Sequence, residues 1–259
     1  FLLQWNHNAP TDGWWISDGT SAGTSLLTNL EVQVKSSSGT FYRSGPEFTV
    51  ISNLLFFPAR TLTNGIELWR TDGTSQGTFP LADIEPGSGN SYPNNFTVLN
   101  NVLYFSASNS LTGTELWRTD GTRVGTWMVA DIVPGFGNSL PSFLTTLDDR
   151  IYFRGADTWW GNELWVSDGT SAGTQLFTNL APHPSTQPGY PNRHSAPGPI
   201  QAALGRLFFE ADDGLGELGR ELWVSDGTTA GTRLTRDIAE LLPTGDFPIP
   251  PTLSSLSRR

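Results

Sequence analysis

Five aspartates follow a tryptophan at the same distance along this chain, and repeated carboxylates of this kind could hold calcium, contact a sugar or transfer a proton. They lie in the signature Trp-x-Ser/Thr-Asp-Gly-Thr, at Asp18, Asp72, Asp120, Asp168 and Asp226. An aspartate that opens a glycine-containing turn accepts backbone N–H groups of its own turn. Because one protein seldom needs five identical catalytic acids, we interpret these aspartates as structural turn residues.

Other residues that could hold a metal ion are sparse. The chain has no cysteine, so neither a thiolate metal site nor a cysteine nucleophile is available. The histidines His7, His183 and His194 lack the spacing of a zinc or copper site. Calcium held by Asp212, Asp213 and Glu217 is an open alternative. The sequence otherwise predicts no metal and no cofactor.

The tryptophan of the signature defines a long repeat. It recurs at intervals of 54, 48, 48 and 58 residues, at Trp15, Trp69, Trp117, Trp165 and Trp223. A fixed long period predicts a repeat architecture. We interpret these tryptophans as packing residues between adjacent units rather than as a platform for ligand stacking. Four of them follow a Glu-Leu pair, and we expect Glu67, Glu115, Glu163 and Glu221 to pair with Arg70, Arg118 or neighbouring backbone.

One repeat, residues 93–132, shows the strands that carry the signature. Two apolar segments, 96–99 and 102–105, are joined by Asn100 and Asn101, which tolerate positive φ in a hairpin turn. A polar loop over 108–114 leads to a strand at 115–119, and the Asp-Gly turn leads to a strand at 126–130. These segments are short and rich in β-branched and aromatic residues, without helical periodicity. The class is therefore all-β, with four antiparallel strands per repeat.

A four-stranded meander repeated at this spacing predicts a five-bladed β-propeller formed as a single domain, 1–259. A β-solenoid coil is usually shorter, and a pair of sandwiches would not explain one signature in every unit. Segment 250–259 aligns without a gap on 141–150, so we expect it to supply the missing first strand of blade 1 and close the ring. The predicted blades comprise residues 1–30 with 250–259, 48–84, 96–132, 143–180 and 200–238.

The repeat resembles a known family. Glu-Leu-Trp-x-Ser/Thr-Asp-Gly-Thr, followed by Gly-Thr, occurs at 67–78, 115–126, 163–174 and 221–232. The later Ala-Asp-Ile-x-Pro-Gly occurs at 82–87 and 130–135. Both are similar to the ELWxxDGT repeat family of bacterial, largely extracytoplasmic proteins, and the first copy departs from it with Gly13-Trp14 in place of Glu-Leu. The resemblance implies a secreted propeller-like module, and it implies no catalytic residue or ligand.

The loops at one end of the meander differ in every repeat. In this topology the loops between the second and third strands emerge on the same face as the loops between blades, here called the variable-loop face. Varied loops on a rigid scaffold are common sites of recognition. Aromatic residues with polar neighbours suit a sugar ring or a protein contact. The aromatic residues in these loops include Tyr92 and Phe136, and our candidate ligand-binding residues are Trp5, His7, Trp159, Trp160 and Tyr190.

Charge and composition limit the function classes. A formal net charge of -10 disfavours binding to nucleic acid or to an anionic membrane surface. The abundant Gly, Pro, Ser, Thr and Asn are typical of secreted β-proteins, and the start at Phe1 suggests a processed chain. A glycoside hydrolase would need paired carboxylates near the axis, where the predicted inner strands carry no acid except Glu47 just before one and Asp148-Asp149 in a turn after another. We therefore predict a secreted or surface-displayed, non-catalytic binding module that recognises carbohydrate in a lectin-like manner. The alternative is a protein-interaction module of a larger surface complex.

Overall fold

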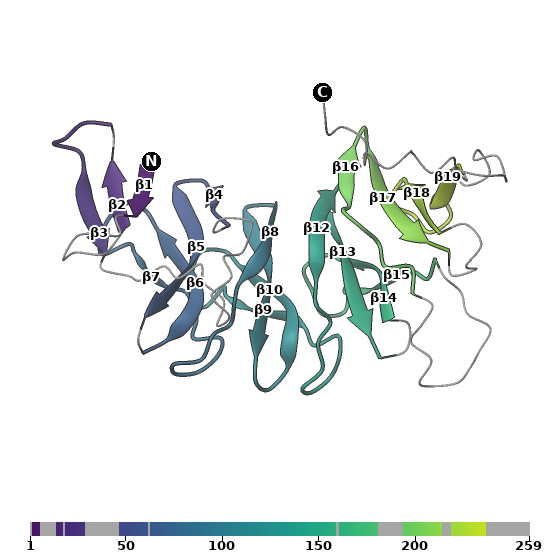
Figure 1. The fold of residues 1–259 in the computed structure, drawn as a ribbon, viewed down its shortest axis with the longest axis horizontal. Coiled ribbons are helices and arrows are strands. Elements are labelled where there is room, and N and C mark those ends of the chain that lie inside the picture. The colour runs from purple at the N-terminus through teal and green to yellow at the C-terminus, as the bar shows by residue number, and fades with distance from the viewer. Residues whose placement is uncertain are drawn as a thin grey trace, which may run out of the picture.

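The computed structural model describes residues 2–5, 14–17, 19–28, 47–61, 63–158, 161–180, 194–213 and 219–236. Every regular element among them is a β-strand, and the strands form five antiparallel sheets. Figure 1 shows these sheets side by side in chain order, from the purple N-terminal sheet to the yellow-green one. No helix long and apolar enough to span a bilayer occurs in these ranges.

Four of the sheets have four strands each, in the order of the sequence. Sheet 2 contains β4 (Thr49–Ile51), β5 (Leu54–Thr61), β6 (Gly65–Thr71) and β7 (Phe79–Pro80). Sheet 3 contains β8 (Asn94–Leu99), β9 (Val102–Asn109), β10 (Gly113–Thr119) and β11 (Trp127–Ala130). Sheet 4 contains β12 (Ser142–Leu147), β13 (Arg150–Asp157), β14 (Gly161–Ser167) and β15 (Gln175–Thr178). Sheet 5 contains β16 (Gln201–Ala203), β17 (Arg206–Asp212), β18 (Arg220–Ser225) and β19 (Arg233–Arg236).

Sheet 1 has three strands among the described residues: β1 (Leu2–Trp5), β2 (Trp14–Ser17) and β3 (Ser25–Thr28). The prediction of an all-β chain built from four-stranded antiparallel sheets is therefore confirmed for sheets 2 to 5. The predicted fourth strand of sheet 1, at 250–259, lies outside the described residues, and so does closure of the ring.

In the repeat at residues 93–132 the hairpin turn follows from the sequence, whereas each of the four strands differs from its predicted range at one end. Asn100 and Asn101 form the predicted turn between Leu99 and Val102, with φ of 51° and 62°. The predicted loop over 108–114 is shorter, because β9 continues to Asn109 and β10 begins at Gly113. Polar Ser108 and Thr114 pair with each other across these strands, and their polarity alone had suggested a loop.

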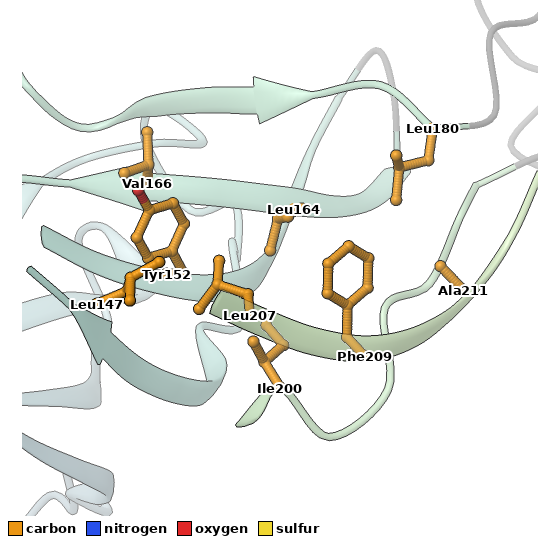
Figure 2. Close-up of a cluster of buried hydrophobic side chains, with 9 residues drawn as sticks. All are labelled: Leu147, Tyr152, Leu164, Val166, Leu180, Ile200, Leu207, Phe209 and Ala211. Carbon is orange, nitrogen blue, oxygen red and sulfur yellow. The ribbon is translucent and has the colours of Figure 1, made fainter. Parts of the chain in front are cut away.

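The sheets pack face to face through apolar side chains. Leu68 and Phe56 of sheet 2 cluster with Leu103 and Phe105 of sheet 3. Leu164 and Tyr152 of sheet 4 cluster with Leu207 and Phe209 of sheet 5, as Figure 2 shows. The backbones of neighbouring sheets approach each other through the first strands β4, β8, β12 and β16. The apolar core of the protein therefore consists of clusters that lie between the facing sides of neighbouring sheets.

Candidate functional site

The aspartate of each described signature closes its own turn. Asp168 Oδ1 accepts hydrogen bonds from the Thr170 backbone N–H, at 2.9 Å, and from Thr170 Oγ1, at 2.7 Å. These donors hold the pKa of Asp168 below its usual value. A Cβ at Gly173 would lie 2.1 Å from the Asp168 carboxylate, so glycine is the residue that leaves room for it. Asp72, Asp120 and Asp226 make the same two bonds, whereas Asp18 lies outside the described residues.

The same turn docks on the sheet before it. Tyr152 of sheet 4 donates its hydroxyl to the Gly227 carbonyl of sheet 5, at 3.2 Å. A Cβ at Gly169 would lie 2.2 Å from the Tyr104 hydroxyl of sheet 3. In the same way, Gly121 lies against Phe56 of sheet 2. The signature therefore contributes to contacts between sheets as well as to its own turn.

The repeated tryptophans lie mostly within the packed sheets. Trp165 is 8% exposed and belongs to an apolar cluster with Leu99 and Tyr104 of sheet 3. Trp117 and Trp223 likewise pack against the clusters on the side of the preceding sheet. Trp69 is buried, and Trp15 is half-buried in sheet 1. These positions leave little aromatic surface for a ligand.

A set of buried glutamates begins the segments that carry the signature. Of the two expected kinds of partner, arginine or backbone, the described hydrogen bonds of Glu67, Glu115 and Glu163 show backbone N–H groups. Glu163 accepts hydrogen bonds from the backbone N–H and the hydroxyl of Ser195, in the loop to the next sheet, and the serine hydroxyl was not expected. Glu115 binds both groups of Ser139 in the same way, whereas Glu67 accepts from the Ser91 hydroxyl and from the backbone N–H groups of Ile84 and Glu85. All three glutamate side chains are fully buried, and burial raises the pKa of each to about 7. The hydrogen-bond donors lower the pKa, but their effect is smaller than that of burial.

This glutamate–serine pair joins neighbouring sheets. The Ser91 N–H donates to the Ile66 carbonyl of sheet 2, and the Ser91 carbonyl accepts from Ser108 N–H of sheet 3, at 2.8 Å. Ser139 and Ser195 carry the same connection to Ala156 and Asp212. The regular position of the glutamate two residues before each tryptophan indicates that it has a repeated role. Its serine partner lies 24 to 32 residues after the glutamate and is not part of a local motif, so the pair is not evident from the sequence.

The variable-loop face is described only in part. Trp159, Trp160, Tyr190 and His7 lie outside the described residues, and Trp5 is placed only as backbone of β1. The distances between the side chains of the candidate ligand-binding residues therefore lie outside what the structure describes, and their grouping stays a prediction.

The described loops of this face expose apolar residues at sheet 3. The exposed fractions are 70% for Leu111, 82% for Phe136 and 54% for Leu140. The two loops that carry them touch, because a Cβ at Gly113 would lie 1.7 Å from the Gly137 carbonyl oxygen. Leu140 N–H donates to the Thr114 carbonyl at 3.2 Å. We call Leu111, Phe136 and Leu140 the apolar patch.

The described residues contain no group of three or more His, Asp or Glu side chains placed to hold a metal ion. Glu47 accepts a hydrogen bond from the Phe96 N–H at 2.9 Å, and burial raises its pKa. This carboxyl thus links the starts of two neighbouring first strands.

Comparisons with known proteins give structural likeness only. No family model matches the chain, and no curated protein matches it. Among solved structures, it is similar to a puromycin hydrolase, with 14% identity, a TM-score of 0.48, and coverage of 82% of this chain and 30% of that one. It is also similar to a prolyl endopeptidase, with 10% identity, a TM-score of 0.47, and coverage of 90% and 32%.

A third similar structure is an α-L-arabinofuranosidase from Clostridium thermocellum, with 12% identity, a TM-score of 0.33, and coverage of 73% of this chain and 70% of that one. The chain spans about a third of the length of the puromycin hydrolase and of the prolyl endopeptidase. The arrangement of four-stranded antiparallel sheets is propeller-like, and these likenesses concern the fold alone.

Proposed function

We propose that this chain is a secreted or surface-displayed, non-catalytic binding module of the ELWxxDGT repeat type, and that its ligand docks on the variable-loop face. In this proposal sheets 1 to 5 are the blades of a five-bladed propeller, with 250–259 completing sheet 1. The turns on the opposite face are short, the Asp-Gly turn is nearly invariant among the repeats, and both serve the fold. Recognition is therefore left to the loops that differ.

The observation that carries the proposal is the apolar patch. Leu111, Phe136 and Leu140 are each more than half exposed, although apolar side chains of this size are stabilised by burial. The backbone contacts between their loops hold the patch in place without these side chains. Leucine offers a sugar neither a stacking face nor a hydrogen bond, so the patch favours a protein partner.

Carbohydrate recognition is the second candidate, and a different residue favours it. Tyr92 is 40% exposed on the same face, and its carbonyl accepts from the Asn94 amide at 2.7 Å. An exposed phenol beside amide groups suits the apolar face and hydroxyl edge of a sugar ring. The sequence candidates Trp159 and Trp160 lie outside the described residues.

The experiment compares partner capture by the wild type and by the triple variant Leu111→Ser, Phe136→Ser, Leu140→Ser. We expect a stoichiometric protein partner from the native source to be captured by the wild type and lost with the variant. The matched control is Val124→Ser with Leu204→Ser, because these residues are 93% and 94% exposed in turns of the opposite face. Equal capture by both variants would refute a protein contact at the patch.

A glycan array run with the same proteins tests the second candidate. Glycan binding that is lost in Tyr92→Ala or in the double variant Trp159→Ala, Trp160→Ala would support the lectin-like function. Binding that persists in folded forms of both variants would rule these residues out as the sugar site.

A further inference from the structure

One arginine of sheet 4 is not required by the repeat. Arg154 lies in the middle of β13, paired with Leu164 of the signature. The residues in the same position of sheets 2, 3 and 5 are Pro58, Ser106 and Glu210. Since neither charge nor size is shared at this position, the fold itself does not demand a guanidinium here.

The guanidinium of Arg154 is held in a fixed orientation. Its Nε–H donates to Ser142 Oγ at 3.1 Å, and its Cζ lies 4.7 Å from the centre of the Phe143 ring. Stacking on one face and bonding through Nε leave the two terminal nitrogens as a preorganised fork. No hydrogen bond from these nitrogens to any described residue is present.

The backbone under this arginine indicates that the stacking partner has a role. Phe143 adopts a left-handed φ of 57°, and Asn95, in the same position of sheet 3, has a φ of 58°. Asparagine tolerates this conformation, whereas a bulky residue is strained there by roughly 1 kcal/mol. Phenylalanine at this position provides the surface on which the guanidinium lies.

The charge of Arg154 is uncompensated within the described residues. The ion pair recorded among the described residues joins Arg220 to Glu210, at 3.0 Å, and does not include Arg154. Burial, with a smaller effect from the charge of Arg220, lowers the pKa of Arg154. A half-buried guanidinium without a carboxylate is a favourable place for an incoming anion. Because the chain as a whole has a net charge of -10, a local positive charge of this kind favours negatively charged ligands at this one place.

We propose that Arg154 is the anion-recognition residue of the variable-loop face, and that it binds a carboxylate of an acidic side chain on the protein partner. The inference rests on the proposed function, because Leu140 of the apolar patch lies only two residues before Ser142. A partner segment that combines an acidic with apolar side chains would cover both. The planar fork matches a carboxylate with two parallel N–H···O bonds.

Titration of the isotope-labelled chain with two short peptides tests this assignment. The peptides are acetyl-Leu-Glu-Leu-amide and its matched Gln form, and the readout is the side-chain Nε–H resonance of Arg154. We expect a saturable shift with the Glu peptide and an affinity roughly tenfold to a hundredfold weaker with the Gln peptide, as charge-assisted bonds predict. Arg154→Lys, which keeps the charge and loses the fork, should show an intermediate affinity.

Control variants separate this inference from the proposed function. In Arg154→Gln the preference for the Glu peptide should disappear, whereas Arg220→Gln, which removes an arginine already paired with Glu210, should retain it. Equal affinity of the wild type for the two peptides would overturn the proposal. A saturable shift with trigalacturonic acid and none with the Glu peptide would overturn the assignment to a protein acid. Partner capture lost in the apolar-patch variant but unchanged in Arg154→Gln would leave the proposed function standing and refute the role of Arg154.

Discussion

Replacement of Glu163 by Gln is expected to reduce the pH dependence of the free energy of unfolding. Burial raises the pKa of Glu163 from 4.5 to about 7, which means that the folded chain binds a proton here that the unfolded chain has lost. The stability that results is fully present below pH 4.5 and is lost as the pH rises through about 7. The variant has no such proton and no such loss.

The size of the effect follows from the two pKa values. In the window between them, each such carboxyl changes the free energy of unfolding by about 1.4 kcal/mol per pH unit. From about pH 5 to about pH 8, the loss for Glu163 alone is about 2.5 kcal/mol. Glu67 and Glu115, whose pKa values are also raised to about 7, continue to lower the stability of the variant over this range.

Urea unfolding followed by tryptophan fluorescence at several pH values between these limits measures the difference. Glu163→Gln should be less stable than the wild type near pH 5, because the amide offers one acceptor to the Ser195 donors, and it should gain on the wild type as the pH rises. Glu210→Gln is the control, since Glu210 is exposed and paired with Arg220.

Identical pH profiles for Glu163→Gln and the wild type would refute the reasoning. Such a result would mean that the donors from Ser195 and the Leu180 backbone outweigh burial and keep the carboxylate ionised in the folded chain. A wild-type stability that rises with pH through this window would contradict the sign of the effect directly.

Three further substitutions test the turn and its contact with the preceding sheet. Asp168→Ala should lower the free energy of unfolding by about 1 to 2 kcal/mol, because two donors of Thr170 lose their acceptor, and urea unfolding near neutral pH measures it. Gly173→Ala should cost at least about 2 kcal/mol in the same assay, since its Cβ would overlap the Asp168 carboxylate; a neutral result would show that the turn can relax. Tyr152→Phe should cost about 1 kcal/mol through the lost bond to the Gly227 carbonyl, and a thermal midpoint equal to that of the wild type would contradict this.

The binding experiments depend on a feature that the sequence suggested only in outline. The variable-loop face was predicted from loops that differ between repeats, and Phe136 was among its non-repeating aromatic residues. Leu111 and Leu140 were not singled out, because an isolated leucine in a loop gives no indication of its exposure. Their exposure depends on how the loops of residues 109–113 and 135–140 support each other through backbone contacts.

The repeat, the all-β class and the turns can be predicted from the amino-acid sequence. Alternating short apolar segments, Asn100-Asn101 and the Asp-Gly turns are local signals, since the backbone conformations they favour involve only neighbouring residues. The tertiary structure alone decided which residues meet across the sheets. Glu163 with Ser195, Tyr152 with Gly227, and Arg154 over Phe143 depend on how strands and sheets are placed in space, and a periodic sequence does not specify such contacts by spacing. Burial then sets the charge states of these groups, because only packing removes a carboxyl or a guanidinium from water.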